Sequence, residues 1–462
     1  MLLLNCGHQN LTKLSAILIK DQGRQLAFWA LKAVHQGTYA DVALHRVLKS
    51  SLAEVDRRLI TELVYGATRQ QRTLDVLINQ LAQKPADRQP PDLRTLLHLG
   101  LYQLRYLDHI PTHAAIHTTV ELAKHNRMAG LTGFVNGFLR QYGRLAEQGD
   151  PLDLPTDSIP RLGVQYSYPD WIVQVWQAQL GFTETEELCH VLNQPPAITL
   201  RINPLQTDLD TVQTQLAAVG VVTHPVPPLP QALEIEGNPG PIHQLPGFEQ
   251  GDWTVQDASA QLVSHWVNPQ PGSVVIDLCA APGGKTTHMA ELMQDQGEIW
   301  ACDRTPSRLR KLQQNVQRSR LQSVKLWTGD SRNLPAHLPL ADYLLVDAPC
   351  SGLGTLHRHA DARWQQTPDK VKVLAQLQTE LLTAGAQQVK PGGLLVYATC
   401  TLHPTENEAI IAQFLDQHPN WLPELASNAI ATAFASTEGW VKIWPHQRGM
   451  DGFFMAALRQ QR

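Results

Sequence analysis

Short apolar segments in the second half of the chain end at residues that can do chemistry. SVVIDL, GEIWACD, VKLWTGD and YLLVDAP each reach an aspartate and GGLLVYATC reaches a cysteine, so the end residues are Asp277, Asp303, Asp330, Asp347 and Cys400. Helical stretches separate most of these segments, which indicates a parallel sheet covered on both faces. Ligands of such sheets bind at the carboxyl ends of the strands. We therefore expect one site that gathers these side chains.

The loop CAAPGGKTT, residues 279–287, follows the first segment and admits two interpretations. Its second half fits the phosphate-binding pattern G-x-x-x-x-G-K-[ST] of nucleotide hydrolases. The position of the first glycine, however, is Cys279, and Pro282 removes an N–H that should face phosphate. Gly283 and Gly284 instead let the backbone approach a different adenosine ligand closely. We favour the second interpretation and keep an ATPase as the alternative.

The aspartates beyond this loop favour a ligand without a polyphosphate. Asp303 lies 26 residues after Asp277 and ends the next segment, where a Rossmann-like unit binds ribose hydroxyls. Asp330 could accept a hydrogen bond from an adenine amine. An acidic pocket would repel phosphates but suits S-adenosylmethionine (SAM), whose sulfur is cationic. We therefore expect SAM as the methyl donor.

Two cysteines stand at presumed strand ends, Cys350 in DAPCSG and Cys400 in YATC. A thiolate at such a position can act as a nucleophile that forms a covalent intermediate with a substrate. Asp347 could act as an acid that supplies a proton, and the second thiol could assist the final elimination. From the residues alone the two cysteines are interchangeable, because a Pro-Cys nucleophile is also typical of DNA cytosine-C5 methyltransferases.

The remaining cysteines form no pattern. No C-x-x-C pair occurs, so we expect neither a disulfide framework nor a metal site. We assign these cysteines to packing, to the surface or to the backbone of the cofactor loop: Cys6, Cys189, Cys279 and Cys302.

Composition and periodicity predict three domains. Residues 1–147 show helical patterns without strand-like alternation, residues 148–247 are Pro-rich and read as a small α+β connector, and residues 248–462 read as a Rossmann-like α/β domain. The first 147 residues hold 18 Lys and Arg against 11 Asp and Glu, a net charge of +7, whereas the remainder carries −11. A basic helical domain on an acidic body favours contact with a polyanion.

No apolar run approaches the roughly 18–20 residues that span a bilayer. The N-terminal MLLLNCGHQN lacks the basic region of a signal peptide. We therefore expect a cytoplasmic protein without membrane contact, and a monomer.

Four ordered motifs carry a family resemblance. DLCAAPGGKTT, DAPCSGLGT, VYATCTLHPTENE and DGFFMAAL resemble the RNA cytosine-C5 methyltransferases. In front of them, HLGLYQLRYLDHIPTHAAIHTTVELAK and GFVNGFLR resemble the NusB-like domain of bacterial 16S ribosomal RNA methyltransferases of the RsmB (Sun or Fmu) type. The resemblance covers nearly the whole chain.

The resemblance implies SAM-dependent methylation of C5 of a specific cytosine in 16S rRNA, with Cys400 as the nucleophile that bonds to C6 and Cys350 as the thiol that assists product release. Asp303 would bind the ribose, and Asp330 and Asp347 would complete the SAM site. The implied SAM loop consists of Cys279, Ala280, Ala281, Pro282, Gly283, Gly284 and Lys285. Ser331 and Thr401 depart from the residues of many relatives, by small changes.

Two further alternatives would each share part of this chain's organisation. A transfer RNA methyltransferase would share the catalytic half, and a non-enzymatic RNA-binding module would share only the helical domain. The retained cysteines argue against the second. The target cytosine must be unpaired or flipped out, since stacking hides C6. The basic loop GTLHRHADARW (354–364) is expected to lie over the RNA, with a phosphate contact from Arg358 or Arg363; His288, His357 and His359 could touch RNA or be solvated.

Overall fold

The chain divides after Asp170 into two units. The computed structural model describes residues 22–49, 51–425, 429–434 and 438–461. The predicted domain boundaries at residues 147 and 247 stay predictions. Within these described ranges, no helix is long and apolar enough to cross a membrane.

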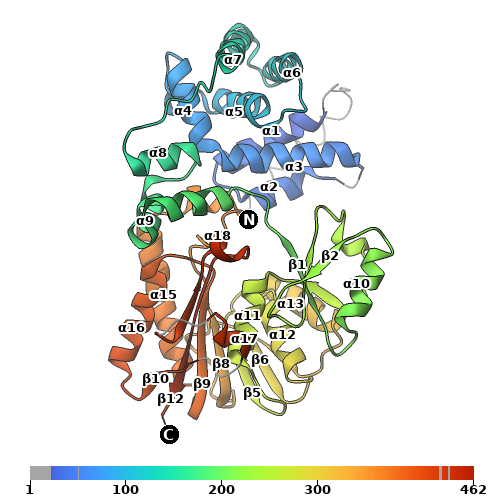
Figure 1. The fold of residues 1–462 in the computed structure, drawn as a ribbon, viewed down its shortest axis with the longest axis vertical. Coiled ribbons are helices and arrows are strands. Elements are labelled where there is room, and N and C mark those ends of the chain that lie inside the picture. The colour runs from blue at the N-terminus through green and yellow to red at the C-terminus, as the bar shows by residue number, and fades with distance from the viewer. Residues whose placement is uncertain (1–21, 50, 426–428, 435–437, 462) are drawn as a thin grey trace, which may run out of the picture. The chain divides into compact units, whose positions relative to one another are not determined.

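The first unit is helical, as its sequence pattern predicted (Figure 1). Its α-helices are α1 (Gln22–His35), α2 (Ala40–Val47), α3 (Glu54–Arg69), α4 (Gln71–Leu81), α5 (Pro91–Tyr106), α6 (Thr112–His125), α7 (Thr132–Ala146) and α8 (Ser158–Gln165). Two short 3-10 helices, η1 (Ala86–Arg88) and η2 (Ala129–Leu131), complete it.

Helix α5 forms the centre of this unit. Leucines on several sides of it are buried, which is the pattern of a helix enclosed by others. Its neighbours approach closely at glycines: a Cβ on Gly66 of α3 would fall 2.0 Å from the ring of Tyr102 of α5. A Cβ on Gly100 of α5 would press against Leu139 of α7 at 3.0 Å. Larger residues at Gly66 and Gly100 would force these helices apart.

The second unit begins with α9 (Asp170–Val191), which is interrupted at Gly181, where φ is 76°. A small antiparallel sheet follows in the order β2-β3-β1-β4, with α10 and η3 beside it in sequence. Leu200, Leu216 and Trp253 are buried in its apolar core. The elements are β1 (Ile198–Ile202), α10 (Leu209–Ala217), β2 (Thr223–Pro225), β3 (Ala232–Ile235), η3 (Ile242–Gln244) and β4 (Trp253–Val255).

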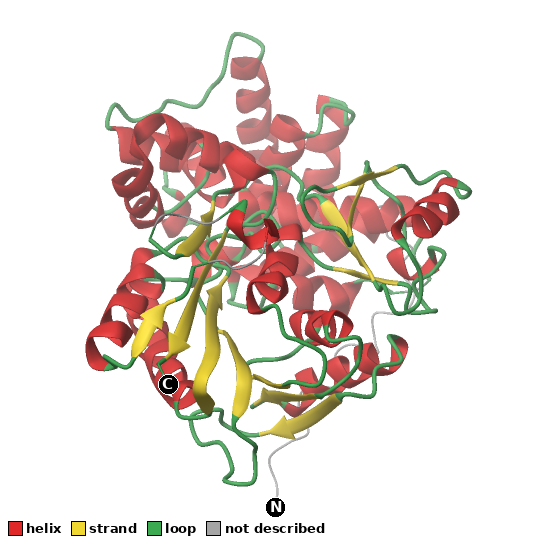
Figure 2. Ribbon diagram, turned by 60° about the horizontal axis from the view of Figure 1, so that its bottom comes forward, coloured by secondary structure: helices red, strands yellow, loops and turns green. Residues whose placement is uncertain are grey.

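The larger sheet has the order β10-β12-β9-β8-β5-β6-β7, and β11 pairs with β12 (Figure 2). All five segments expected to form a parallel sheet do so: β5 pairs with β6 and β8, β6 with β7, and β8 with β9. The strands are β5 (Val274–Asp277), β6 (Glu298–Asp303), β7 (Val324–Thr328), β8 (Ala341–Asp347), β9 (Val389–Thr399), β10 (Trp421–Pro423), β11 (Trp440–Ile443) and β12 (Phe453–Gln460). The antiparallel strands β10, β11 and β12 extend the sheet beyond β9.

Helices cover both faces of this sheet, as the continuous apolar strands predicted. Val275 of β5 packs in one core with α11 and α12, whereas the next residue, Ile276, packs in the other core with α15 and α16. The helices of this unit are α11 (Ala258–Val267), α12 (Gly284–Leu292), α13 (Pro306–Arg318), α14 (Ala362–Gln365), α15 (Pro368–Ala386), η4 (Pro404–Glu406), α16 (Glu408–Gln417), α17 (Ala429–Thr432) and α18 (Pro445–Arg448).

The strand order reverses between β5 and β8. From β5 the chain proceeds outward to β6 and β7, then returns to the opposite side of β5 for β8 and β9. Ligands of open α/β sheets bind at such a reversal, outside the carboxyl ends of the strands. Asp277, Asp303 and Asp347 are the last residues of β5, β6 and β8, and Cys400 directly follows β9.

Candidate active site

A cavity of about 520 Å³ opens at the carboxyl edge of the parallel strands. Its lining brings together most of the residues predicted from the sequence: Cys279, Ala281, Lys285, Asp303, Asp330, Asp347, Cys350 and Cys400. Ala280, Pro282, Gly283 and Gly284 lie in the same loop but do not line the cavity. Phe453 of β12 and Ser331 also border it.

The loop between β5 and α12 needs glycine at Gly283 for a local reason. This residue has φ of 105° and precedes the first residue of α12. A Cβ there would lie 2.7 Å from Cγ of Leu312 on α13. Positive φ and close packing therefore both exclude a larger residue. The loop turns tightly enough for Cys279 and Ala281 to face the cavity.

Asp277 ends β5 but lies behind the cavity. It is fully buried, and its Oδ2 accepts a hydrogen bond of 2.7 Å from Thr286 Oγ1 in the first turn of α12. Burial, with a further contribution from the charge of Asp347, raises the pKa of Asp277 to about 7. This aspartate fixes the start of α12 instead of contacting a ligand in the cavity.

Lys285 points to a carboxylate. Its Nζ donates a 2.7 Å hydrogen bond to Oδ2 of Asp347, and it lies 4.9 Å from the ring centre of Phe453. Burial opposes the lysine charge, but the interaction with Asp347 outweighs it, so the pKa of Lys285 lies above its usual value. The Lys285 ammonium therefore binds a carboxylate of the protein, whereas the lysine of a P-loop binds a phosphate of the nucleotide.

The other two acids of the cavity also have cationic neighbours. Arg308 lies 3.4 Å from Oδ2 of Asp303, and Arg332 lies 2.6 Å from Oδ2 of Asp330. The hydrogen bonds from Arg332 lower the pKa of Asp330 to about 2. The sequence-based expectation of an acidic pocket was wrong, because each lining carboxylate is matched by a lysine or arginine. These arginines follow their acids closely in DRTPSRLR and DSRN, a signal that was available in the sequence.

The two strand-end cysteines face each other. The Sγ atoms of Cys350 and Cys400 are 3.4 Å apart. The hydrogen bond with Cys400, together with burial, raises the pKa of Cys350 well above its usual value. Cys350 therefore remains a thiol. Lys285 interacts electrostatically with Cys400, which places a cation near this sulfur.

Comparison with known proteins identifies the family. Residues 264–459 match the family model described as 16S rRNA methyltransferase RsmB/F, residues 21–144 match the NusB family, and residues 168–243 match the ferredoxin-like domain of RsmF/B-like methyltransferases. A protein of Synechocystis sp. described as a probable ribosomal RNA small subunit methyltransferase B is 50% identical over 449 residues, which cover 95% of this chain and 99% of that protein. The chain belongs to the RsmB/F family.

Further similarities agree with this membership. A Bacillus subtilis protein of the same description is 35% identical, with 96% of this chain and 99% of that protein covered. The crystal structure of PH0851 has a TM-score of 0.80 at 27% identity, covering 96% of this chain and all of that one. A methyltransferase homolog protein from Pyrococcus horikoshii has a TM-score of 0.58 at 28% identity, covering 66% and 100%.

These findings confirm the predicted resemblance and fold class: a NusB-like helical domain, a small α+β connector of ferredoxin-like type and a Rossmann-like methyltransferase domain. They also confirm SAM as the methyl donor. The cavity fits that ligand, since it is as large as pockets for drug-sized molecules and carries carboxylates that can accept hydrogen bonds from hydroxyl and amine groups.

In this RsmB/F-family methyltransferase, a buried network ties together the loops that carry the two cysteines. Ser351 donates its backbone N–H to Oε1 of Glu406 at 2.9 Å and shares a 2.8 Å hydrogen bond with the Thr401 hydroxyl. The Ser351 hydroxyl also binds Oε2 of Glu406, and Gln378 donates to Oε1 at 3.0 Å. Thr401 thus retains a hydroxyl that the network uses. Glu406 lies within the motif VYATCTLHPTENE, but no role was predicted for it from the sequence.

Arg201 is a second residue whose role was not predicted from the sequence, and it connects the small sheet to the end of the loop 279–285 and to α12. Arg201 of β1 is fully buried and pairs with Glu291 of α12 at 2.7 Å. It also donates to the carbonyl oxygen of Gly284 at 2.6 Å and to Oγ1 of Thr287 at 2.9 Å. A charged residue inside the apolar strand AITLRIN was the available signal. Arg201 holds the first turn of α12 in place.

The two arginines of the loop 354–364 that were expected to contact phosphate have structural roles instead. Arg363 is fully buried, so its predicted phosphate contact is wrong. Arg358 forms ion pairs with Asp257 at 3.0 Å and Asp451 at 2.8 Å, and His357 also bonds to Asp451 at 2.8 Å. The charge of Arg358 is therefore compensated by carboxylates of the protein.

The remaining histidines and cysteines are distributed as follows. His288 is buried and hydrogen-bonds to Gln231, whereas His359 is exposed. Cys189 and Cys302 are buried, as expected for packing residues, and Cys279 is partly exposed at the cavity. Cys6 lies outside the described residues.

Proposed function

We propose that this chain transfers the methyl group of SAM to C5 of a specific cytosine in 16S rRNA through a covalent adduct between Cys400 and C6. The observation that carries this proposal is the pair of thiols, 3.4 Å apart, in the cavity of a methyltransferase. A single nucleophilic thiol would serve adduct formation alone. A second thiol in contact with it serves the elimination that must follow.

The cycle begins when the Cys400 thiolate forms a bond to C6 and the ring becomes an enamine. C5 then takes the methyl group, and the bond from that methyl to the sulfonium sulfur breaks, which leaves S-adenosylhomocysteine. In the release step the electron pair of the C6–Cys400 bond leaves with the Cys400 sulfur, which takes the proton of Cys350. The resulting Cys350 thiolate takes the C5 proton, and the C5–C6 double bond forms again. The raised pKa of Cys350 keeps its proton available beside the departing sulfur, so Cys350 assists release.

Asp347 acts through its ion pair in this proposal. Negative charge builds on the ring around N3 when the thiolate adds, and it requires a hydrogen-bond donor or a cation. Asp347 forms an ion pair with Lys285. This pair compensates the charge on the ring better than a neutral carboxyl group of Asp347 alone would, because it includes the Lys285 ammonium. The pair also orients the base edge next to both cysteines.

The SAM contacts proposed from the sequence remain part of this scheme. Asp303 accepts hydrogen bonds from the ribose hydroxyls, Asp330 from the adenine amine, and the loop from Cys279 to Lys285 approaches the ligand through its backbone. Arg308 lies beside Asp303, and Arg332 lies beside Asp330 and lowers its pKa. The family membership removes the ATPase and the non-enzymatic module as alternatives.

Labelled methyl transfer from SAM to 16S rRNA, followed by denaturing gels, tests the roles of the cysteines. We expect Cys400→Ala to transfer no methyl group and Cys350→Ala to accumulate a covalent protein–RNA adduct. Cys302→Ala, which removes a thiol outside the cavity, should behave like the unaltered chain. Exchanged outcomes for Cys400 and Cys350 would reverse their roles. Methylation of transfer RNA but not of 16S rRNA would favour the transfer RNA alternative.

Three other predictions remain proposals: the division into residues 1–147, 148–247 and 248–462, a cytoplasmic location, and a monomeric state. Limited proteolysis and sedimentation of the purified chain test the first and the third. Fragments that begin near the predicted boundaries and a sedimenting mass of one chain are the expected results.

A further inference from the structure

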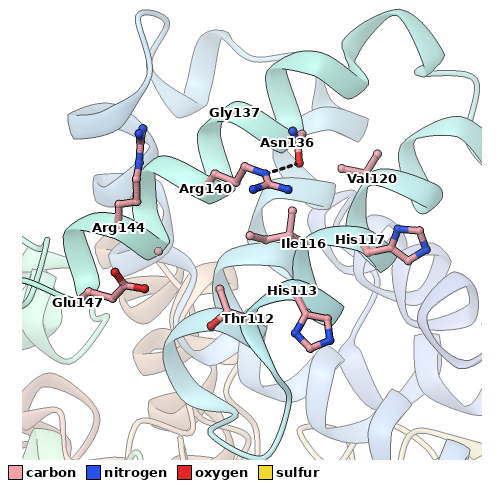
Figure 3. A pocket seen from close by; sticks show the side chains of 11 residues that line it. Thr112, His113, Ile116, His117, Val120, Asn136, Gly137, Arg140, Arg144 and Glu147 are labelled. Atoms are coloured by element: carbon pink, nitrogen blue, oxygen red, sulfur yellow. Dashed lines mark hydrogen bonds between the residues drawn. The ribbon is translucent and has the colours of Figure 1, made fainter.

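A second cavity lies in the first unit, between α6 and α7. Its volume is about 630 Å³, and Figure 3 shows the side chains around it. Helix α6 contributes His113 and His117, and α7 contributes Asn136, Arg140 and Arg144. No residue of the proposed methyl-transfer chemistry belongs to it. The proposed function thus assigns no role to this groove.

The spacing of these residues places them on two facing helix surfaces. Asn136, Arg140 and Arg144 follow one another at intervals of four along α7, and His113 and His117 have the same interval on α6. Residues four apart lie on one face of a helix. Each helix therefore turns a polar face to the groove, with both arginines on α7, above the buried side chain of Ile116.

The two arginines of the groove have no carboxylate partner. Within the residues that the structure describes, neither Arg140 nor Arg144 forms an ion pair, and Arg140 donates only to the amide oxygen of Asn136, at 3.1 Å. Other arginines of this unit do form ion pairs, as Arg94 does with Asp75 and Arg105 with Asp150. The groove thus keeps positive charge that internal acids do not compensate.

A favourable helix dipole accounts for only one of these charges. Arg144 lies in the last turn of α7, where a cation is stabilised by the helix dipole, but Arg140 lies a full turn earlier. Glu147 is the single acid among the lining residues, and it forms no ion pair with Arg144 within the described part of the chain. The arrangement is therefore suited to an external anion.

Glycine leaves room for a ligand at the wall of the groove. A Cβ built on Gly137 meets no atom within 4 Å, so this position borders open space. Glycine inside a helix costs roughly 1 kcal/mol relative to alanine, and packing gives no reason for it here. Its absence of a side chain lets a chain-like ligand approach the α7 backbone between Asn136 and Arg140.

We propose that the groove between α6 and α7 binds backbone phosphates of the RNA substrate. Unpaired arginines bind phosphate oxygens by charge-assisted hydrogen bonds, and histidine and asparagine side chains can contact adjacent phosphates or sugars. This inference rests on the proposed RNA substrate and assigns the part of the basic helical unit that holds it. The contacts fix the position of the RNA and are independent of its base sequence.

A charge-matched pair of variants tests the groove in the full-length chain. We expect Gly137→Glu to weaken binding of a radiolabelled 16S rRNA transcript about tenfold in filter-binding assays, since its carboxylate repels phosphate and engages Arg140. Gly137→Gln has nearly the same shape without the charge, so it narrows the groove equally but does not repel phosphate, and it should weaken binding clearly less than Gly137→Glu does. Equal effects of Glu and Gln would overturn the phosphate assignment.

Removal of the arginines provides a second, independent readout. For Arg140→Ala/Arg144→Ala we expect the slope of log affinity against log salt concentration to become shallower by about 1.4–1.8, which corresponds to two lost phosphate contacts. Arg58→Ala removes an exposed arginine of the same unit that is already paired with Glu54 and should leave the slope unchanged. An unchanged slope for the double variant would contradict the proposal.

The result separates this inference from the proposed function. If the double variant binds the free transcript normally but binds intact small ribosomal subunits weakly, the groove contacts a protein and the phosphate assignment fails. If all variants and the unaltered chain bind RNA as expected but no methyl group reaches 16S rRNA, the proposed function fails while the groove assignment stands.

Discussion

In the cavity of the second unit Lys285, Arg308 and Arg332 each lie beside a carboxylate, whereas in the groove of the first unit Arg140 and Arg144 have no such partner within the described residues. Both cavities are lined by cations, so the presence of basic residues does not distinguish them. What differs is whether an internal acid already compensates the charge.

This difference indicates two kinds of ligand. In the paired cavity the cations orient carboxylates that can accept hydrogen bonds from the hydroxyl and amine groups of SAM. In the unpaired groove the charge is free for an external anion, which suits a polyphosphate backbone. We therefore propose SAM as the ligand of the paired cavity and the RNA backbone as the ligand of the unpaired groove.

The largest effect is expected when a buried paired cation is removed. Arg201→Met leaves Glu291 in the interior without its cation, and we expect the free energy of unfolding to fall by about 3–5 kcal/mol in urea titrations. Arg201→Met/Glu291→Leu removes both charges and should recover most of that loss. Arg140→Ala, from the groove, should not change unfolding measurably. A double variant as unstable as the single one would contradict the pairing account.

The next largest effect concerns catalysis. Lys285→Met removes the ammonium beside Asp347 and Cys400, and we expect kcat to fall by about 10²–10³-fold because charge on the ring is no longer compensated. Affinity for the 16S rRNA transcript should be unchanged in the same protein preparation. Loss of RNA affinity with a normal kcat would place Lys285 in RNA binding and break the distinction between the cavities.

A smaller effect is expected at Asp277, the one strand-end aspartate that forms no ion pair within the residues that the structure describes. The pKa of Asp277 is about 7 in the folded protein, above that of an unfolded aspartate, so the folded state holds the proton more tightly. Stability is therefore full below the unfolded pKa near 4 and declines as pH rises from about 4 to 7, by at most about 1.4 kcal/mol per pH unit.

Asp277→Asn checks this sign, because the amide does not titrate. Urea unfolding of both proteins at pH 5 and pH 8 should show the variant gaining stability relative to the unaltered chain as pH rises. A variant that instead loses stability relative to the unaltered chain as pH rises would show that Asp277 is stabilised as the anion.

The smallest effect is expected at the exposed rim of the catalytic cavity. Arg332 is solvent-accessible and pairs with both Asp330 and Glu380, and exposed pairs contribute little to stability. We expect Arg332→Ala to keep its unfolding midpoint and to weaken SAM binding less than about threefold in calorimetric titrations. A loss of SAM affinity beyond about tenfold would show that Arg332, and not Asp330 alone, contacts the ligand.

The sequence was sufficient for the features that depend on local pattern. Continuous apolar runs between helices predicted the parallel strands. The position of Asp303, Asp347 and Cys400 at strand ends followed directly from those runs, since parallel strands end at one edge.

The sequence was insufficient where a residue depends on a distant partner. Arg201 and Glu291 are separated by 90 positions, and the burial of Arg363 depends on the fold around it. Glu406 became recognisable only when the loops of Cys350 and Cys400 were side by side. The arginines beside Asp303 and Asp330 were near in sequence, but their pairing required the cavity geometry.

The most direct measurement of the central claim is bisulfite sequencing of 16S rRNA after incubation with SAM and the full-length chain. The account predicts one newly protected cytosine, which is absent when Cys400→Ala replaces the unaltered protein and present when Gly137→Gln does. A 16S rRNA with no newly protected cytosine, or with the same protected cytosine produced by Cys400→Ala, would contradict it.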